Sequence, residues 1–244
     1  MTVGRENGGL LPDAREHVGD RPIRAVIFDL DGVLVDSEIW WDEARRAWAR
    51  RHGRGWTEDD RRAVMGANGR QWSQTMHDRL GVDVPPERIE AEVVDAVVDR
   101  YRREGPPRID GAVEGVRRIA ARVPVAVASS AHVAVIRAAL EGLGLTDAFA
   151  VVVSSDEVAH GKPAPDVYLE TARRLGVPTG EILVVEDSYN GVLAGRDAGM
   201  RVVLVPNRSI PPAPGTAEIA DVVIPSLREL DPDALGIGSE RPGS

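Results

Sequence analysis

The sequence contains no cysteine, and aromatic residues make up only 4% of it. Without cysteine the chain has no disulfide, no thiolate zinc site and no cysteine nucleophile, which agrees with a reducing compartment. No apolar run approaches the roughly 20 residues that a membrane span requires. The N-terminal residues also lack the apolar core of a signal peptide. We therefore expect a cytoplasmic protein.

The chain also lacks an excess of positive charge. It carries 39 acidic against 30 basic residues, a formal net charge of -9. Such a balance attracts neither nucleic acid nor an anionic membrane surface. A hydrophobic content of 43% over 244 residues is ample for a globular core. The composition thus favours a globular protein that acts on small molecules.

Short runs of Val, Ile and Ala indicate parallel strands that are buried on both faces. Between most of these runs lie helix-length segments that close with a glycine, as helix C-caps do. This alternation predicts right-handed crossovers and an α/β fold with a doubly wound, Rossmann-like parallel sheet. The expected strands occupy residues 24–30, 123–130, 150–155, 182–187 and 201–206, and a shorter one follows Ala220.

One interval, residues 37–105, breaks the alternation and reads as successive amphipathic helices without a strand. All five tryptophans fall in it, and Trp41, Ala44 and Trp48 share one helical face, as residues of a bundle core do. We expect an inserted helical cap domain that forms a lid over the strand ends. The other expected boundaries are a core domain at 22–36 and 106–235 and flexible tails at 1–21 and 236–244.

Polar side chains lie at or beyond the carboxyl ends of four of the expected strands. Because the carboxyl ends of parallel strands meet at one edge of the sheet, these side chains are expected to lie together. Asp29, Glu186 and Asp187 can then share a divalent cation, whose charge relieves their mutual repulsion, and their oxygens suit Mg²⁺. The residues are Asp29 and Asp31 at the end of the first strand, Ser129 and Ser130 at the end of the second, Lys162 in the loop beyond the third, and Glu186 and Asp187 at the end of the fourth.

The remaining residues of this group suit phosphoryl chemistry. Ser129 or Ser130, together with Lys162, can bind the oxygens of a phosphate. Asp29 can attack phosphorus and form an aspartyl phosphate, which divides one difficult displacement into two easier steps. Asp31 can protonate the leaving oxygen and later deprotonate water.

Four segments, DLDGVLVDSE, ASS, GKPAP and VVEDSYNGVLAGRDAGM, resemble in order the four motifs of the haloacid dehalogenase superfamily. The branch is the one with a helical cap after the first motif, subfamily I, which holds phosphatases and β-phosphoglucomutases. The similarity extends from Arg24 to Leu230. It implies Mg²⁺ as cofactor and these roles: Asp29 as nucleophile, Asp31 as acid/base and backbone metal ligand, Ser129 and Lys162 as phosphate ligands, and Asp187 with Glu186 as metal ligands.

The resemblance also narrows the expected function. The dehalogenases lack the second aspartate of the first motif, so Asp31 favours phosphoryl transfer. We expect a magnesium-dependent phosphatase that hydrolyses a small phosphate monoester, a sugar phosphate or a phosphoglycolate-like compound, through an aspartyl phosphate. Its expected partner is a small phosphorylated metabolite, with no nucleic acid and no membrane, and its expected state is a monomer or a homodimer.

Two other functions remain open. A β-phosphoglucomutase passes through the same intermediate, but relatives of that kind carry a histidine where this chain has Trp41. Trp40 and Trp41 also offer little of the polar gate that a mutase needs to exclude water. The third function, from another class, is a catalytically idle protein that only binds phosphometabolites.

Several residues of the acidic stretch and the lid are ambiguous. A calcium loop needs oxygen ligands where the run has Val33 to Val35, so we set it aside. Asp36 or Ser37 can cap the first lid helix. Arg70 is the lid residue that we expect to bind substrate, and His132 can bind substrate or begin its helix. A basic run is expected to form a solvated face, and its members are Arg45, Arg46, Arg50, Arg51 and Arg54.

Overall fold

A parallel sheet forms the centre of the computed structural model, which describes residues 21–65 and 67–238. Within these residues the sheet has six strands in the order β3-β2-β1-β4-β5-β6, and all neighbouring pairs are parallel. The doubly wound α/β fold is therefore confirmed. The strands are β1 (Ala25–Phe28), β2 (Val125–Ser129), β3 (Val151–Ser154), β4 (Ile182–Glu186), β5 (Arg201–Leu204) and β6 (Val222–Val223).

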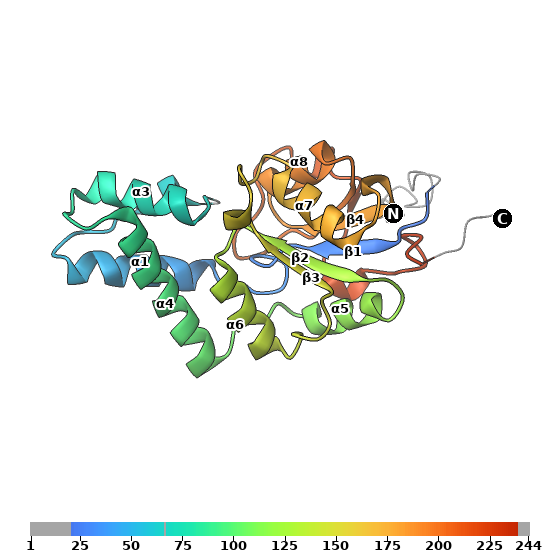
Figure 1. Ribbon diagram of the computed structural model, residues 1–244, viewed down its shortest axis with the longest axis horizontal. Helices are drawn as coiled ribbons and strands as arrows, with labels where there is room; N and C mark the ends of the chain where they lie inside the picture. Colours follow the sequence, from blue (N-terminus) through green and yellow to red (C-terminus); the bar gives the residue numbers. More distant parts are fainter. Residues whose placement is uncertain (1–20, 66, 239–244) are drawn as a thin grey trace, which may run out of the picture.

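Helices cover both faces of the sheet, as Figure 1 shows. Successive strand residues point to opposite faces, so Val26 and Phe28 join one hydrophobic cluster while Ala25 and Ile27 join the other. Both faces being covered explains why the strand sequences are apolar without alternation. On the first face lie α5 (Ala112–Ala120) and α6 (Val133–Leu143), and on the second α7 (Asp166–Leu175) and α8 (Tyr189–Asp197); the short α9 (Thr216–Ile219) precedes β6.

Four helices fill the interval between β1 and α5. Thr57 and Asn68 begin two of them with capping boxes, in which each side chain accepts from the third residue's backbone N–H. The last of the four packs against α6 and so connects the insertion to the core. In Figure 1 the insertion lies to the left of the sheet. The helices are α1 (Glu38–Arg51), α2 (Glu58–Val64), α3 (Gly69–Leu80) and α4 (Pro86–Glu104).

Even α4, the 19-residue helix of this insertion, is amphipathic and carries charged residues along its length. Throughout residues 21–65 and 67–238, no helix combines the length and the apolar composition that crossing a membrane requires.

The C-terminal boundary of the core differs from the expectation. Ile237 is buried and pairs with Ile23, whose backbone N–H donates to Gly236 O at 3.1 Å. The N–H of Gly238 in turn donates to Ile23 O at 2.9 Å. The core therefore extends to residue 238 rather than 235. The polar and glycine-rich sequence around Ile237 did not indicate that this side chain would be buried. The expected N-terminal tail lies, except for Arg21, outside the described residues.

The buried face of α1 gives a test of the insertion's stability. Trp48 is fully buried, and its indole N–H donates to Glu92 Oε2 at 2.9 Å. Trp48→Ala should lower the free energy of unfolding by about 3–5 kcal/mol, because it leaves a large cavity. Ile39→Ala, at a site on the same helix that is 57% exposed, should change it by less than about 0.5 kcal/mol. Urea unfolding followed by circular dichroism measures both, and equal effects would contradict this packing.

Candidate active site

A cavity of about 380 Å³ opens at the carboxyl ends of the strands. It is lined by residues at or just beyond the carboxyl ends of β1, β2 and β4, which are neighbours in the sheet, and by the loops after β3 and β5. The structure thus brings together the expected site residues other than Arg70. These are Asp29, Asp31, Ser129, Ser130, Lys162, Glu186 and Asp187.

Lys162 lies at the centre of this group and is the only lysine of the chain. Its side chain is 5% exposed, and its ammonium donates to Asp29 Oδ1 at 2.5 Å and to Glu186 Oε1 at 2.7 Å. A third bond goes to the carbonyl oxygen of Ala128 at 3.2 Å. Burial acts to lower the pKa of Lys162, but the two carboxylates raise it well above its usual value. The ammonium is therefore a fixed positive charge between the ends of β1 and β4.

Glu186 holds this lysine in place. Its Oε1 accepts from Lys162 and from the hydroxyl of Tyr168 at 2.9 Å. Its Oε2 accepts from the N–H groups of Asp187 and Ser188 and from the Ser188 hydroxyl. Burial acts to raise the pKa of Glu186, yet Lys162 and these hydrogen bonds lower it. With five donors already bound, Glu186 is built to orient Lys162, and its expected role as a metal ligand stays a prediction.

Tyr168 was missed by the sequence analysis. It lies in α7, is fully buried and places its ring 4.8 Å from the Lys162 ammonium. A tyrosine on the inner face of an amphipathic helix indicates core packing, and nothing in the sequence links it to a residue 18 positions later. Its buried hydroxyl needs a partner, and that requirement is the one signal that could have placed it near a carboxylate.

The acidic residues suit a divalent cation. Oxygens of Asp29, Glu186 and Asp187 lie within 4.8 Å of one another. Burial, the larger cause, together with Glu186 and Asp31 raises the pKa of Asp29 to about 8 against the opposing effect of Lys162. Burial and the charges of Glu186 and Asp29 also raise that of Asp187 well above its usual range. A bound cation would relieve this repulsion, and carboxylate oxygens are the ligands that Mg²⁺ prefers.

Gly32 makes room for one side of this group. Its φ of +86° is rarely adopted by other residues, and a Cβ there would lie 1.9 Å from Asp187 Oδ2. The turn after β1 therefore packs directly against the Asp187 carboxylate. Asp29 and Asp187, whose oxygens are less engaged than those of Glu186, are the residues that would hold the ion.

Asp31 lies in the same cavity, on the side of the helical insertion. The Ser37 hydroxyl donates a short hydrogen bond to Asp31 Oδ1. Burial raises the pKa of Asp31 to about 6, although Ser37 acts to lower it. A carboxyl group with this pKa holds a proton part of the time near neutral pH, as a general acid must.

The expected capping of α1 is only half correct. Ser37 does occupy the N-cap position, but its side chain makes no capping hydrogen bond because it donates to Asp31 instead. Asp36 does not cap either: it accepts from Asn207 Nδ2 at 3.3 Å and from the Ser209 hydroxyl at 2.5 Å. Both side chains thus tie the start of the insertion to the core.

The two serines at the end of β2 differ in exposure. Ser129 is 1% exposed, and its hydroxyl oxygen accepts from the Ala131 N–H at 3.0 Å. Ser130 is half-buried and lines both the main cavity and a second, smaller one. Their contacts with a phosphate stay predictions.

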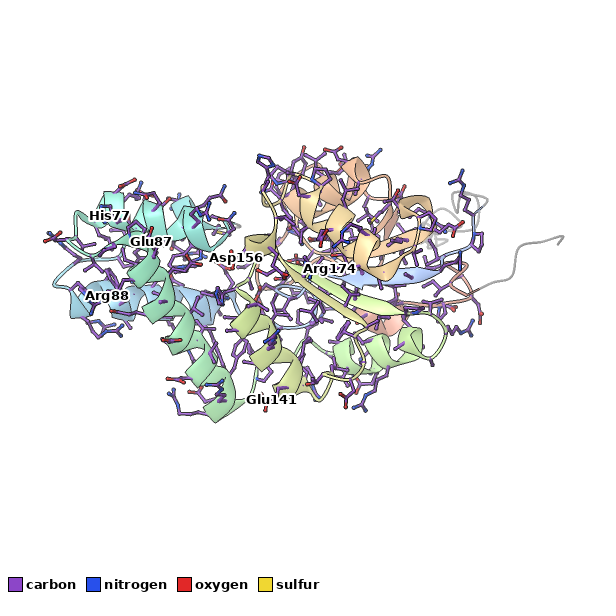
Figure 2. All side chains as sticks on the ribbon, in the orientation of Figure 1. His77, Glu87, Arg88, Glu141, Asp156 and Arg174 are labelled. Atoms are coloured by element: carbon purple, nitrogen blue, oxygen red, sulfur yellow. The ribbon has the colours of Figure 1, made fainter. Side chains whose placement is uncertain are left out.

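Arg70 lies apart from this group. It is exposed on α3 and lines a third cavity of about 540 Å³, between the insertion and the loop after β3. Glu87 and Asp156, labelled in Figure 2, lie on the two sides of that cavity. His132 lines it too, and its Nδ1 accepts from the Ala134 N–H at 3.2 Å, so it begins α6. The substrate contact of Arg70 stays a prediction.

Arg45 corrects the expectation of a solvated basic face. The other four arginines of that run are exposed, but Arg45 is 5% exposed. It follows Trp41 by one helical turn and therefore lies on the inner face of α1. Its guanidinium lies 5.2 Å from the Trp41 ring and 5.1 Å from the Trp72 ring. Two indole faces that accept a cation explain how an arginine occupies this buried position.

The fold and the arrangement of these side chains define an enzyme of the doubly wound α/β class with its site at the strand ends. A family model described as haloacid dehalogenase-like hydrolase matches residues 23–199. The chain belongs to this family, as its four motifs predicted. An acidic cluster beside a lysine agrees with the metal dependence that is general in this family.

Curated relatives agree with the assignment. Hexitol phosphatase A of Escherichia coli (strain K12) is 33% identical over 208 residues, which cover 85% of this chain and 93% of that protein. A bifunctional riboflavin kinase/FMN phosphatase of Arabidopsis thaliana is 30% identical over 217 residues. That match covers 87% of this chain but 55% of the relative, so the chain spans about half of that protein.

A solved structure shares the fold. The crystal structure of a putative beta-phosphoglucomutase from Thermotoga maritima is 30% identical, with a TM-score of 0.67. The match covers 85% of this chain and 96% of that one. The family model and the phosphatase relatives show that the chain is an enzyme, a phosphoric monoester hydrolase of the haloacid dehalogenase type.

The contact between Gly32 and Asp187 can be tested against a matched glycine. Gly53 also has a positive φ, +69°, but a Cβ there would meet nothing within 4 Å. Gly53→Ala should lower the free energy of unfolding by roughly 1–2 kcal/mol, because alanine adopts a positive φ only with strain. Gly32→Ala should cost more, because it must also displace the Asp187 carboxylate.

Urea unfolding of both variants in the presence of EDTA compares the two costs without any contribution from metal. Equal losses of stability would show that the turn does not pack against Asp187.

Proposed function

We propose that this protein is a magnesium-dependent phosphatase that hydrolyses a small phosphate monoester, of the sugar-phosphate kind, through phosphorylation of Asp29. The observation that carries the proposal is the single cavity in which Asp29 and Asp31 lie together with Lys162 and Asp187. A nucleophile, an acid, a fixed cation and a metal ligand then surround one volume. The names of the phosphatase relatives support the same reaction class.

The first half of the reaction follows from the positions of two aspartates. Lys162 binds Oδ1 of Asp29, and Oδ2 accepts no hydrogen bond from the residues that the structure describes. Oδ2 therefore attacks phosphorus, and the bond from phosphorus to the leaving oxygen breaks. Asp31 gives its proton to that oxygen, so the alcohol leaves in neutral form. Lys162, Ser129 and Ser130 bind the phosphoryl oxygens.

The second half reverses the proton transfer. Asp31, now ionised, accepts a proton from water as the water attacks phosphorus. The bond between Asp29 and phosphorus breaks, and inorganic phosphate and the free carboxylate result. Magnesium, held by Asp29 and Asp187, would supply positive charge against the phosphate oxygens and so allow an anionic carboxylate to approach them.

Asp29→Asn should reduce turnover of p-nitrophenyl phosphate with magnesium by a factor of at least about 10³, because an amide forms no acyl phosphate. EDTA should abolish wild-type turnover, and added magnesium should restore it. Phosphate release and the thermal unfolding midpoint measure activity and folding separately.

Asp36→Asn is the matched control, because Asp36 is another carboxylate that lines the same cavity. We expect the Asp36→Asn enzyme to retain most of its activity. A folded Asp29→Asn enzyme with near wild-type turnover would show that Asp29 is not the nucleophile.

A mutase activity is the second candidate, supported by the putative beta-phosphoglucomutase among the structural relatives. The sequence predicts a lid with no polar gate near Trp41. The buried guanidinium of Arg45 lies against that ring, however, and places a polar group there. The missing histidine at Trp41 still favours hydrolysis over transfer to a sugar hydroxyl.

Product analysis distinguishes the two activities. With magnesium, β-glucose 1-phosphate and a bisphosphate primer, we expect inorganic phosphate to exceed glucose 6-phosphate. A predominance of glucose 6-phosphate would make the protein a mutase. A protein that only binds phosphometabolites would show affinity in the same assay without releasing phosphate.

The setting of this reaction also belongs to the proposal. We infer a small phosphorylated metabolite as partner, a cytoplasmic location, no binding of nucleic acid or membrane, and a monomeric or homodimeric protein. The acidic composition supports the exclusion of polyanionic partners.

A further inference from the structure

A second cavity, of about 90 Å³, adjoins the one that contains Asp29. Asp31, Glu38 and Ser130 line both cavities. The proposed reaction places the leaving oxygen beside Asp31, so the group attached to that oxygen extends into this second cavity. On this scale one water molecule needs about 10–15 Å³, so the cavity has room for part of a hydroxylated leaving group.

Two polar groups in this cavity have no hydrogen-bond partner. The Nε and one terminal nitrogen of Arg45 are buried without a partner, and so is Oε1 of Glu38, among residues 21–65 and 67–238. The indole rings of Trp41 and Trp72 lie 5.2 Å and 5.1 Å from the guanidinium carbon, but a ring face does not replace a hydrogen-bond acceptor for these N–H groups. Unpaired buried polar groups destabilise a protein, so their presence beside a reaction centre calls for a ligand.

The charges of the cavity decide which ligand fits. Arg45 provides one positive charge, and Glu38 provides one negative charge along the same wall, while Asp31 carries its proton when the leaving group is bound. Glu38, Asp42 and Asp31 also oppose the lowering of the Arg45 pKa that burial causes. An anionic group would be attracted by Arg45 but repelled by Glu38. A hydroxyl group accepts from the guanidinium and donates to the carboxylate at once.

We infer that Arg45 and Glu38 are specificity-determining residues that bind the hydroxyl groups of a neutral, polyhydroxylated leaving group. This inference rests on the proposed phosphatase function and narrows its substrate to alditol or sugar phosphates, with carboxylate-bearing phosphate esters disfavoured. Arg45 donates to a hydroxyl oxygen, and the same hydroxyl donates to Glu38. The two tryptophans fix the guanidinium so that it needs little reorganisation on binding.

The experiment compares three phosphate esters: sorbitol 6-phosphate, phosphoglycolate and p-nitrophenyl phosphate. The quantity measured is kcat/KM for each ester divided by kcat/KM for p-nitrophenyl phosphate, which has no hydroxyl on its leaving group. In the wild type we expect this ratio to be higher for sorbitol 6-phosphate than for phosphoglycolate. In Arg45→Met the ratio for sorbitol 6-phosphate should fall by about tenfold to a hundredfold, the usual effect of removing a charged hydrogen-bond donor.

Two further variants sharpen the comparison. Glu38→Gln should lower the same ratio, because it removes the charged acceptor but keeps the size of the side chain. Arg50→Met is the matched control: it removes an exposed arginine from the same helix, and the ratio should not change. If Arg45→Met does not fold, Arg45→Lys keeps the charge between the indole rings but loses the fork of N–H groups, and the ratio should still fall.

The outcomes separate this inference from the proposed function. Release of phosphate from p-nitrophenyl phosphate with an unchanged ratio in a folded Arg45 variant would overturn the inference alone. A larger loss on phosphoglycolate than on sorbitol 6-phosphate would also overturn it, because the cavity would then bind an anion. Absence of phosphate release from all three esters in the wild type would overturn the phosphatase proposal itself.

Discussion

The contact between Lys162 and two buried carboxylates is the interaction on which the rest of the site depends. Asp29 directly follows β1 and Glu186 ends β4, and these strands are adjacent in space but far apart in sequence. Buried like charges at this separation repel each other strongly, and a positive charge between them makes the parallel pairing of the two strand ends tolerable. The compact ammonium of a lysine can approach both carboxylates and a carbonyl oxygen at once. The planar guanidinium of an arginine donates only in fixed directions and would not fit this position in the same way.

The site divides into halves that follow the architecture. In the proposed reaction the sheet would provide the charged groups that meet the phosphate, because parallel strands end together. The helical insertion would provide the groups that meet the rest of the substrate, and Asp31 lies at the junction, bonded to Ser37 where the insertion begins. A change of substrate could then be made in the insertion without disturbing the charge balance around Lys162.

The strands, the helical interval and the group at the strand ends could be predicted because they depend on local periodicity and on the general geometry of parallel sheets. The partners of those residues could not. Ser37 has the sequence of a helix cap, but a nearby carboxylate competes for its hydroxyl. Tyr168 and Glu186 meet only in three dimensions. Arg45 was assigned to a solvated face because charge was given more weight than its spacing of one turn from Trp41.

The single lysine also makes the chain unusually simple for amine chemistry. Apart from the terminal amine, the chain offers one ε-amino group to reagents that modify amines, and its side chain is 5% exposed. Its reactivity therefore measures how often the centre of the site opens to solvent. Reductive methylation with ¹³C-formaldehyde would label that nitrogen and the terminal amine, so the one lysine resonance would report the charge of the two carboxylates without any mutation.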